Sequence, residues 1–325
     1  MQRKQWIDIA RGLCMAAILY DHTEVYYTGD NIIPYHLYVT NALIAFYLIS
    51  GYLFYKSGTF YLKRKIASIF RSLIRTYFIF TTLMAAPKTW AHQGELSLTD
   101  VFTNIALGKA SWFVASLIMA EIIFSIIIHI CKEKTWILST LSIACLLLSI
   151  YLSTQQPSYP WQINNALQAV FILYIGYMYH RYEDYFHRFN TPLYTSLLFI
   201  FLIVIKIYER YNDMNMFISP IVIDNYLIFF IDVLVATWLL MRLCQWLSSR
   251  LPCYLLTYTG KYSIIYYFLC GGIPMLVTMA LEKMGWAYDG RYWLVPIAFI
   301  IVYAVATIVT MLYMATFRFN KQPYI

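Results

Sequence analysis

An arginine and a histidine eleven residues apart are the residues of this chain best suited to chemistry. Arg11 and His22 both lie in the first long apolar segment, from Trp6 to Tyr27. Eleven residues of α-helix make three turns with about 20° left over, so the two side chains share one face of the predicted helix. Ionisable side chains inside a membrane helix are costly, usually face a protein interior or a watery cavity, and by default mark a functional site. The pair therefore predicts chemistry carried out inside a bilayer.

His22 has the chemical properties of a general base. An imidazole with an ordinary pKa near about 6.5 can accept a proton from a hydroxyl group. Asp21 and Glu24 are close in sequence, and a carboxylate could orient the ring. Asp21 lies about 100° around the helix from His22, so the spacing does not assure a direct contact. The alternative is an interfacial histidine with a satisfied hydrogen bond.

Three arginines form a second pattern, in the stretch YLKRKIASIFRSLIRTYFIF. Arg64, Arg71 and Arg75 have the spacing i, i+7, i+11, which places them on one face of a regular α-helix. Guanidinium groups bind phosphate oxygens in a bidentate manner, so a stripe open to the cytoplasm predicts a phosphate site. One alternative is a basic cluster that sets topology and touches anionic lipid. Another is a structural ion pair, for which Asp8 is a candidate.

Composition places the chain in a membrane. Its 325 residues are 61% hydrophobic and 12% charged, whereas a soluble domain carries roughly 25% charged residues. The net charge of +8 comes from residues that separate the apolar runs instead of forming one patch, so nucleic acid is not an expected partner. The six cysteines form no CxxC pair, so neither disulfides nor a metal site are expected.

The apolar runs predict an all-α, polytopic integral membrane protein. A spanning helix needs about 20 apolar residues. Ten segments meet this requirement, with short loops between them: 6–27, 37–56, 66–86, 111–130, 135–153, 163–180, 191–208, 220–241, 258–280 and 292–315. The longest loop, from Pro87 to Ala110, has room for a short surface helix. No soluble domain or long linker is evident, so residues 1–325 are expected to form a single membrane-embedded domain.

The distribution of lysine and arginine predicts the orientation. With the N-terminus in the cytoplasm, the inner segments hold 14 of these residues and the outer segments hold 6. Cytoplasmic loops carry the excess of positive charge, so both termini are expected in the cytoplasm. Arg11 then lies in the inner half of its helix and His22 near the outer surface. The density of basic residues on one side fits a bacterial inner membrane.

Several stretches in this order resemble acyltransferase family 3, a family of polytopic membrane proteins. IDIARGLCMAAILYDH is similar to the family's opening, with an acidic residue, Arg-Gly, and a histidine eleven residues past the arginine. LIAFYLISGYLFYKSG is similar to its phenylalanine-rich run into Ser-Gly-Tyr. RTYFIF, ASWFVASL, ALQAVFILYIGYMY and YTGKYSIIYYF resemble later elements. Each stretch is short, and their order and spacing carry the resemblance.

The resemblance implies an O-acyltransferase. Such an enzyme takes an acyl group, usually acetyl, from acyl-coenzyme A in the cytoplasm and passes it to a hydroxyl of a cell-surface or lipid-linked saccharide. Acetyl-CoA is thus expected as the donor substrate, and no tightly bound cofactor is expected. Arg11 and His22 match the family's functional arginine and histidine. His22 would act as general base or as a covalent relay, and Arg11 would orient the donor or stabilise charge on the thioester oxygen.

The other predicted site residues lie in or near the stretches quoted above. The predicted catalytic set is His22, Arg11 and Asp21. The predicted donor-binding set is Arg64, Arg71 and Arg75. The predicted acceptor contacts are Glu24, Trp112, Asn165 and Tyr266.

The chain departs from the family pattern at two places. Many members have two arginines three residues apart, whereas Arg71 and Arg75 are four apart. Many also place a histidine seven residues after the serine of a Ser-Tyr element, where this chain has Cys270 after Ser263.

Two other classes of function stay open. A glycan or lipid transporter or flippase would also need aromatic walls and buried charges, but it would need neither acyl-coenzyme A nor a titratable His22. A non-catalytic sensor or assembly partner could keep the same scaffold, and Cys270 in place of a histidine is consistent with that. The cost of burying Arg11 argues against a scaffold that has lost its chemistry.

Overall fold

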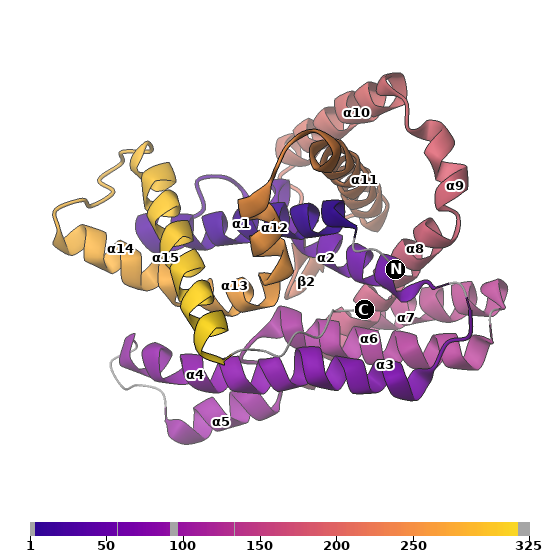
Figure 1. Cartoon of the computed structure of the whole chain (residues 1–325), viewed down its shortest axis with the longest axis horizontal. Coiled ribbons are helices and arrows are strands. Elements are labelled where there is room, and N and C mark those ends of the chain that lie inside the picture. Colours follow the sequence, from indigo (N-terminus) through magenta and orange to yellow (C-terminus); the bar gives the residue numbers. More distant parts are fainter. Residues whose placement is uncertain (1–3, 57, 92–96, 133, 318–325) are drawn as a thin grey trace. The chain divides into compact units, whose positions relative to one another are not determined.

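The computed structural model describes residues 4–56, 58–91, 97–132 and 134–317, and they are mostly helical (Figure 1). Their contacts divide the chain into two compact units. The terminal unit combines the described parts of Met1–Ala42 and Trp238–Ile325, and the central unit is Leu43–Thr237. Each unit has its own set of packed helices.

The terminal unit is built around its first helix. Helix α1 packs against α12, α13, α14 and α15, and it ends at Gly29, whose left-handed φ of 82° a residue without Cβ adopts readily. The bounds of the elements are α1 (Gln5–Thr28), η1 (Tyr35–Leu37), α12 (Tyr254–Lys261), α13 (Ser263–Leu269), α14 (Ile273–Lys283) and α15 (Leu294–Phe317). The last residues of α11 also belong to this unit.

Two glycines allow α1 and α12 to approach closely. A Cβ atom at Gly12 would collide with the carbonyl oxygen of Leu256, and one at Gly260 would collide with the carbonyl oxygen of Asp8. Small residues are common where membrane helices pack backbone to backbone. The glycine after Arg11 is therefore explained by packing, and it fixes the helix that carries the arginine.

The central unit is a larger helical bundle with one small hairpin. Helix α8 packs against α6 and α7, and α3 packs against α6. The strands pair in antiparallel fashion, with Phe217 opposite Val222. The bounds are α2 (Val39–Phe54), α3 (Leu62–Ile69), η2 (Phe70–Ile74), α4 (Arg75–Ala91), α5 (Leu98–Ala106), α6 (Trp112–Cys131), α7 (Thr135–Gln155), η3 (Pro160–Gln162), α8 (Ile163–Arg181), α9 (Glu183–Phe186), η4 (His187–Phe189), α10 (Pro192–Tyr211), β1 (Met216–Ile218), β2 (Ile221–Ile223) and α11 (Tyr226–Arg250).

Glycines also bring α2 and α8 together. A Cβ at Gly51 would collide with the carbonyl oxygen of Leu173, and one at Gly176 would collide with that of Leu48. Both glycines lie in stretches that carried the family resemblance, so these motifs encode a helix contact.

Helices α3 and α4 form one continuous rod, as Figure 1 shows. They are joined by η2, a five-residue π-helical turn. Leu62–Ala85 is long and apolar enough to cross a membrane even with this irregular turn.

The helical membrane class is confirmed, and nine of the predicted segments lie mainly on helices of the described residues. The segment predicted at 220–241 instead begins with strand β2 and becomes helical only at Tyr226. Within the part of the chain that the structure describes, six helices are long and apolar enough to span a membrane by length and composition, and the bent pair α13 and α14 would make a seventh. Helix α2 is apolar but shorter, and α1 and α8 do not meet the same criterion of length and hydropathy. The ninth predicted segment is broken into α12, α13 and α14. The loop predicted to hold a surface helix contains α5. Ten spans, cytoplasmic termini and a single domain stay predictions.

Candidate functional site

An unbroken α1 fixes the spacing of Arg11 and His22. Both side chains are half-buried, and a rise of about 1.5 Å per residue separates their Cα atoms by roughly 16 Å along the axis. Met15 and Ile18 share this face between them and are buried. The two groups therefore occupy one face, as predicted, but lie at separate places along it.

Tyr26, a neighbour of His22 on α1, bonds to the break between α13 and α14. Tyr26, one turn further along α1, has its ring centroid 6.5 Å from that of His22, with 24° between the ring planes. The Tyr26 hydroxyl donates a hydrogen bond of 3.3 Å to the carbonyl oxygen of Gly271. Cys270, the residue at the position where the family often has histidine, is buried next to this glycine and donates from Sγ to the carbonyl oxygen of Tyr267. Cys270, where this chain departs from the family pattern, thus lies close to Tyr26.

Asp21 and Glu24 hold the segment that follows α1. Both carboxylates are buried. Asn31 Nδ2 donates to Asp21 Oδ1 at 2.8 Å, and the backbone N–H of Ile33 donates to Glu24 Oε2 at 3.3 Å. These bonds give both carboxylates a structural role, whereas their catalytic and acceptor-binding roles stay predictions.

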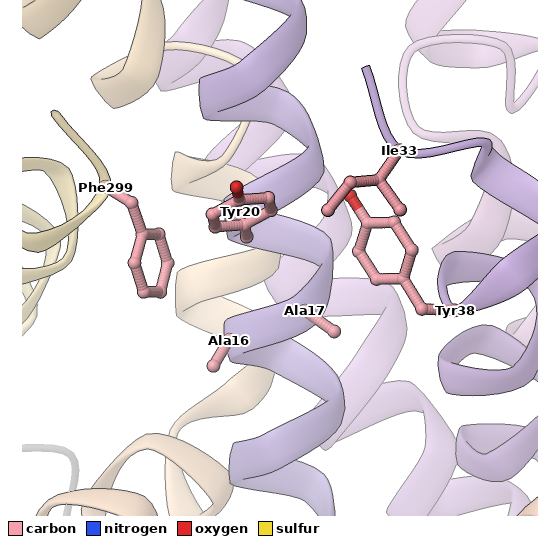
Figure 2. Close-up of a pocket in the computed structure, with 6 residues that line it drawn as sticks. All are labelled: Ala16, Ala17, Tyr20, Ile33, Tyr38 and Phe299. Carbon is pink, nitrogen blue, oxygen red and sulfur yellow. The ribbon is translucent and has the colours of Figure 1, made fainter. Parts of the chain in front are cut away.

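An apolar pocket of about 430 Å³ opens on the other side of α1 (Figure 2). Tyr20 is at its centre, with its ring edge-on to Tyr38 and to Phe299 at centroid distances of 6.3 and 5.3 Å. Tyr20 is two residues from His22, which places it about 160° around the helix. The pocket walls suit an apolar chain and are separate from the His22 face. They consist of Ala16, Ala17, Tyr20, Ile33, Tyr38 and Phe299.

The three predicted donor-binding arginines lie on the rod formed by α3, η2 and α4, and all are exposed. Arg64 lies over the ring of Tyr61 at 5.5 Å. Arg71 donates from Nε to the carbonyl oxygen of Ala67 at 3.2 Å. The π turn adds one residue to the rod, so the single stripe expected of a regular α-helix is not kept, and Arg64 is rotated away from Arg75 by about 80°.

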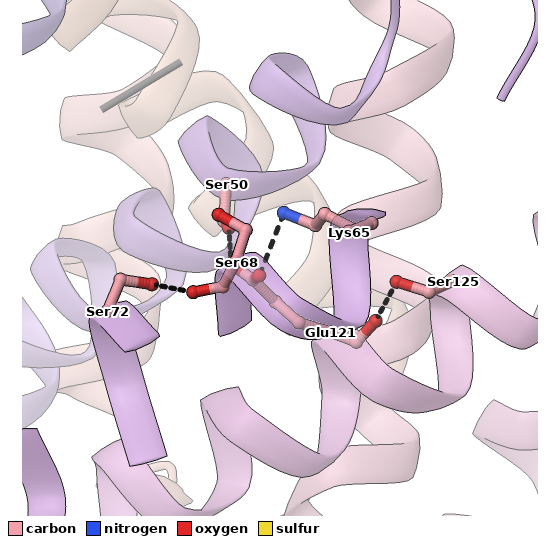
Figure 3. A network of polar contacts seen from close by, with 6 residues as sticks. All are labelled: Ser50, Lys65, Ser68, Ser72, Glu121 and Ser125. Atoms are coloured by element: carbon pink, nitrogen blue, oxygen red, sulfur yellow. Dashed lines mark hydrogen bonds and ion pairs between the residues drawn. The ribbon is translucent and has the colours of Figure 1, made fainter. Parts of the chain in front are cut away.

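Lys65 belongs to an internal polar network and is not a free surface cation (Figure 3). Its Nζ lies 2.9 Å from Glu121 Oε2 and 3.7 Å from the centroid of the Phe54 ring. Ser50 donates a hydrogen bond to Glu121 Oε1, and Ser125 donates to the carbonyl oxygen of Glu121. The network joins α2, α3 and α6.

Positive charge is concentrated at the start of the rod. Partial burial, with the charges of Lys65 and Arg64 as further causes, lowers the pKa of Lys56. A field of this sign favours anions near the start of α3.

The three remaining acceptor-contact candidates differ in their exposure. Trp112 is half-buried at the first turn of α6. Asn165 is buried and donates from Nδ2 to the carbonyl oxygen of Ile218 at 2.6 Å. Tyr266 is fully buried and donates to Thr307 Oγ1 at 2.8 Å. Asn165 and Tyr266 thus take part in internal bonds, and Trp112 is the more accessible of the three.

A buried ionic cluster between α10 and α11 was not predicted from the sequence. Lys206 Nζ lies 3.2 Å from Glu209 Oε2 and 2.8 Å from Asp232 Oδ2, and both carboxylates are buried. The signal in the sequence is the spacing of three residues between Lys206 and Glu209 at the end of an apolar helix. Asp224, expected on the same helix as Asp232, precedes α11 and accepts a bond from the backbone N–H of Asn215.

The long apolar helices define a helical membrane protein. A family model described as an acyltransferase domain matches residues 4–315. The chain therefore belongs to acyltransferase family 3, which confirms the resemblance. No curated protein and no solved structure matches the chain.

Proposed function

We propose that this membrane acyltransferase moves an acetyl group from acetyl-coenzyme A to a hydroxyl of a cell-surface or lipid-linked saccharide. The observation that carries the proposal is the family membership of a chain whose α1 presents Arg11 and His22 on one face. A bacterial inner membrane is the proposed location, because it would separate a cytoplasmic donor from an envelope acceptor.

His22 is the proposed reacting group. As a general base, its imidazole takes the proton of the acceptor hydroxyl while the oxygen attacks the thioester carbon. The C–S bond then breaks, and the thiolate of the coenzyme takes up the proton. As a covalent relay, the imidazole nitrogen first displaces the thiolate and then passes the acyl group to the hydroxyl, whose proton goes to the thiolate as the neutral imidazole is restored. Both routes need His22 in its neutral form.

Arg11 is proposed to bind the donor at a distance from the thioester. Its Cα lies roughly 16 Å from that of His22, and both side chains lean toward the N-terminus of α1, so this separation persists at the level of the side chains. An arginine so placed is poorly positioned to stabilise an oxyanion formed beside His22. Between the two roles expected from the sequence, orienting the donor is therefore the better supported.

Arg71 and Arg75 are proposed to bind phosphate groups of the donor. Their exposure within the central unit and the positive charge at the start of the rod support this role. Guanidinium groups suit phosphate because they donate two parallel hydrogen bonds.

The test is acetyl transfer in membranes that contain the protein, the acceptor and radiolabelled acetyl-coenzyme A. His22→Ala should lower incorporation of label by about a hundredfold or more, as expected for loss of a general base. His129→Ala is the matched control, because His129 is exposed at the end of α6 and should leave incorporation unchanged. Equal incorporation by His22→Ala and wild type would remove His22 from the mechanism. A wild-type protein that neither transfers label nor binds acetyl-coenzyme A would favour transport.

A further inference from the structure

A stripe of residues runs along the face of α1 that points away from His22. Ala17, Tyr20, Glu24 and Tyr27 recur at intervals of three and four residues, so their side chains share one face of the helix. Tyr20 is about 160° around the helix from His22. The terminal unit therefore has a second surface along α1, separate from the proposed reacting group.

The first part of this stripe forms the floor of the apolar pocket (Figure 2). Ala16 and Ala17 have small side chains and leave the space open. The wall formed by Phe299 is fixed from behind, because its ring stacks on Tyr303 with a centroid distance of 5.7 Å and 12° between the planes. The volume of about 430 Å³ falls within the usual range of about 300–1,000 Å³ for ligand pockets. Water finds no hydrogen-bond partners on apolar walls, so the pocket suits a hydrocarbon chain.

The pocket has one polar end. Figure 2 shows the hydroxyl oxygens of Tyr20 and Tyr38 at the end where Ile33 lies. Glu24, one turn beyond Tyr20 on the same face, accepts the backbone N–H of Ile33 at 3.3 Å. Asp21 lies close to the Tyr38 hydroxyl. Two hydroxyls and two carboxyl groups thus gather where a chain in the pocket would carry its head group.

Charge selects among possible head groups. A chain gains little by leaving lipid for an apolar pocket, so the head group decides which lipid binds. The end of α1 and the segment after it carry the carboxyl groups of Asp21, Glu24 and Asp30, whereas residues 12–55 contain no lysine or arginine. This charge distribution repels a phosphate, while carboxylates accept hydrogen bonds from hydroxyl groups. An uncharged head group with several hydroxyls, such as a sugar, fits this end.

Exposed aromatic side chains follow at the end of the stripe. The Tyr27 hydroxyl donates a hydrogen bond to the carbonyl oxygen of Trp286, and the Tyr27 ring lies 6.2 Å from that of Tyr288. These contacts hold the segment between α14 and α15 against the last turn of α1. The segment exposes Trp286, Tyr292 and Trp293, which are 47%, 65% and 60% accessible. Flat aromatic faces of this kind can pack against the C–H groups of sugar rings.

We propose that this face of α1 binds an uncharged glycolipid. Its hydrocarbon chain lies in the pocket beside Tyr20, and its sugars lie against the aromatic side chains of the segment between α14 and α15. The charges of that segment do not alter the choice of head group, because Arg291 pairs with Asp289 at 3.3 Å.

The position of His22 relates this site to the reaction. Glu24 is two residues beyond His22, or about 3 Å along the axis, so the polar end of the pocket is at the level of the imidazole. The two lie on opposite faces of a helix about 10 Å wide, and half of its circumference is roughly 16 Å. In this respect the inference rests on the proposed function: the glycolipid is the lipid-linked acceptor, and its glycan must extend round α1 to bring a hydroxyl to His22.

The first experiment measures photocross-linking to the purified full-length protein in phosphatidylcholine bilayers. The probe is a glucosyl diacylglycerol with a diazirine in one acyl chain, and the label should map to the pocket walls. Ala17→Leu fills the pocket and should lower labelling by about tenfold or more, since it excludes the chain. Ala304→Leu adds the same volume at an exposed position of α15 and should change labelling by less than about twofold. Equal labelling of Ala17→Leu and wild type would overturn the pocket as the site.

The second experiment tests the head group. Unlabelled glucosyl diacylglycerol should compete with the probe, whereas the same concentration of phosphatidylglycerol should not. Equal competition by phosphatidylglycerol would overturn the preference for an uncharged head. The double variant Trp286→Ala, Trp293→Ala should lower labelling by about threefold to tenfold, the range for aromatic contacts. Trp136→Ala, at an exposed tryptophan of α7, is the control for a general effect of interfacial aromatics. Unchanged labelling of the double variant would overturn the contact with the sugars.

A third measurement separates this site from the proposed function. Ala17→Leu should bind acetyl-coenzyme A as the wild type does, because Arg11 and His22 lie on the other face of α1. A wild type that is labelled by the glycolipid but neither binds acetyl-coenzyme A nor transfers acetyl would overturn the proposed function and leave the glycolipid site standing. If thermal unfolding shows that Ala17→Leu is not folded, the cross-links on the wild type decide. Labels that map away from the pocket walls would overturn the site.

Discussion

Burial separates the ionisable residues of this chain into two kinds. Lys65 with Glu121, and Lys206 with its two carboxylates, form bonds inside the central unit. Arg71 and Arg75 are exposed, and the side chains of Arg11 and His22 are half-buried. Buried pairs hold helices together, whereas charges with open surface at membrane depth are suited to binding or reaction.

The cluster around Lys206 offers a direct test of the structural role. Lys206→Met leaves Glu209 and Asp232 buried beside each other without this lysine, and it should lower the free energy of unfolding by about 3–5 kcal/mol. Thermal unfolding in detergent should show a much lower midpoint. Adding Glu209→Gln and Asp232→Asn to Lys206→Met removes the like charges and should restore most of the stability. An unchanged midpoint for Lys206→Met would show that the cluster contributes nothing to stability.

At the residue scale, helical periodicity predicted which side chains share one face of a helix. It did not predict which residues of other segments bond to them. Arg11 and His22 share a face of α1 because eleven residues nearly complete three turns. The partner of Asp21 could not be predicted, because Asn31 reaches it through the path of the segment after α1. The spacing of residues within one helix carries no information on contacts with a segment that folds back onto it.

At the element scale, glycines determine which helices touch. Gly12 and Gly260 bring the backbones of α1 and α12 together, and Gly51 and Gly176 do so for α2 and α8. The glycine-bearing motifs in the sequence therefore mark contacts between helices.

Gly260→Ala should separate α1 from α12, because the added Cβ meets the carbonyl oxygen of Asp8 and backbone atoms cannot easily move aside. We expect a loss of stability of about 1–3 kcal/mol, as for overpacking, together with lower acetyl transfer. Thermal unfolding and the transfer assay measure both. Lys261→Ala, at the next and exposed position, is the control and should change neither. Wild-type stability for Gly260→Ala would mean that the contact between these helices is not close.

Hydrophobic runs predicted where the helices lie, but not where the backbone departs from a regular α-helix. The π turn η2 and the break of one predicted span into α12, α13 and α14 occur within apolar sequence. Such changes depend on which side chains must face the core on either side of them. Ile69 before the π turn and Tyr77 after it are both buried. That requirement comes from packing and has no local sequence signal.

At the scale of the whole molecule, composition and family membership agree on a helical membrane acyltransferase. The apolar content predicted the class, and long apolar helices confirm it. The number of spans depends on whether the more polar α1 and α8, the short α2 and the bent pair α13 and α14 each cross, which hydropathy alone does not determine.

The orientation can be tested on the full-length chain. Because basic residues predict cytoplasmic termini, a fluorescent protein that folds only in the cytoplasm should be bright when fused to either end. Alkaline phosphatase, which is active only outside, should be inactive at both ends. An active phosphatase at one end would mean an odd number of crossings and would contradict the orientation.

The unbroken α1 also fixes the length of the path between Arg11 and His22. The two side chains lie at levels roughly 16 Å apart along the helix axis, with buried Met15 and Ile18 between them. A small thioester could reach only one of these two side chains at a time, whereas a donor with a long flexible arm could reach both. The helix would then select its donor by length, before any contact with the acyl group itself.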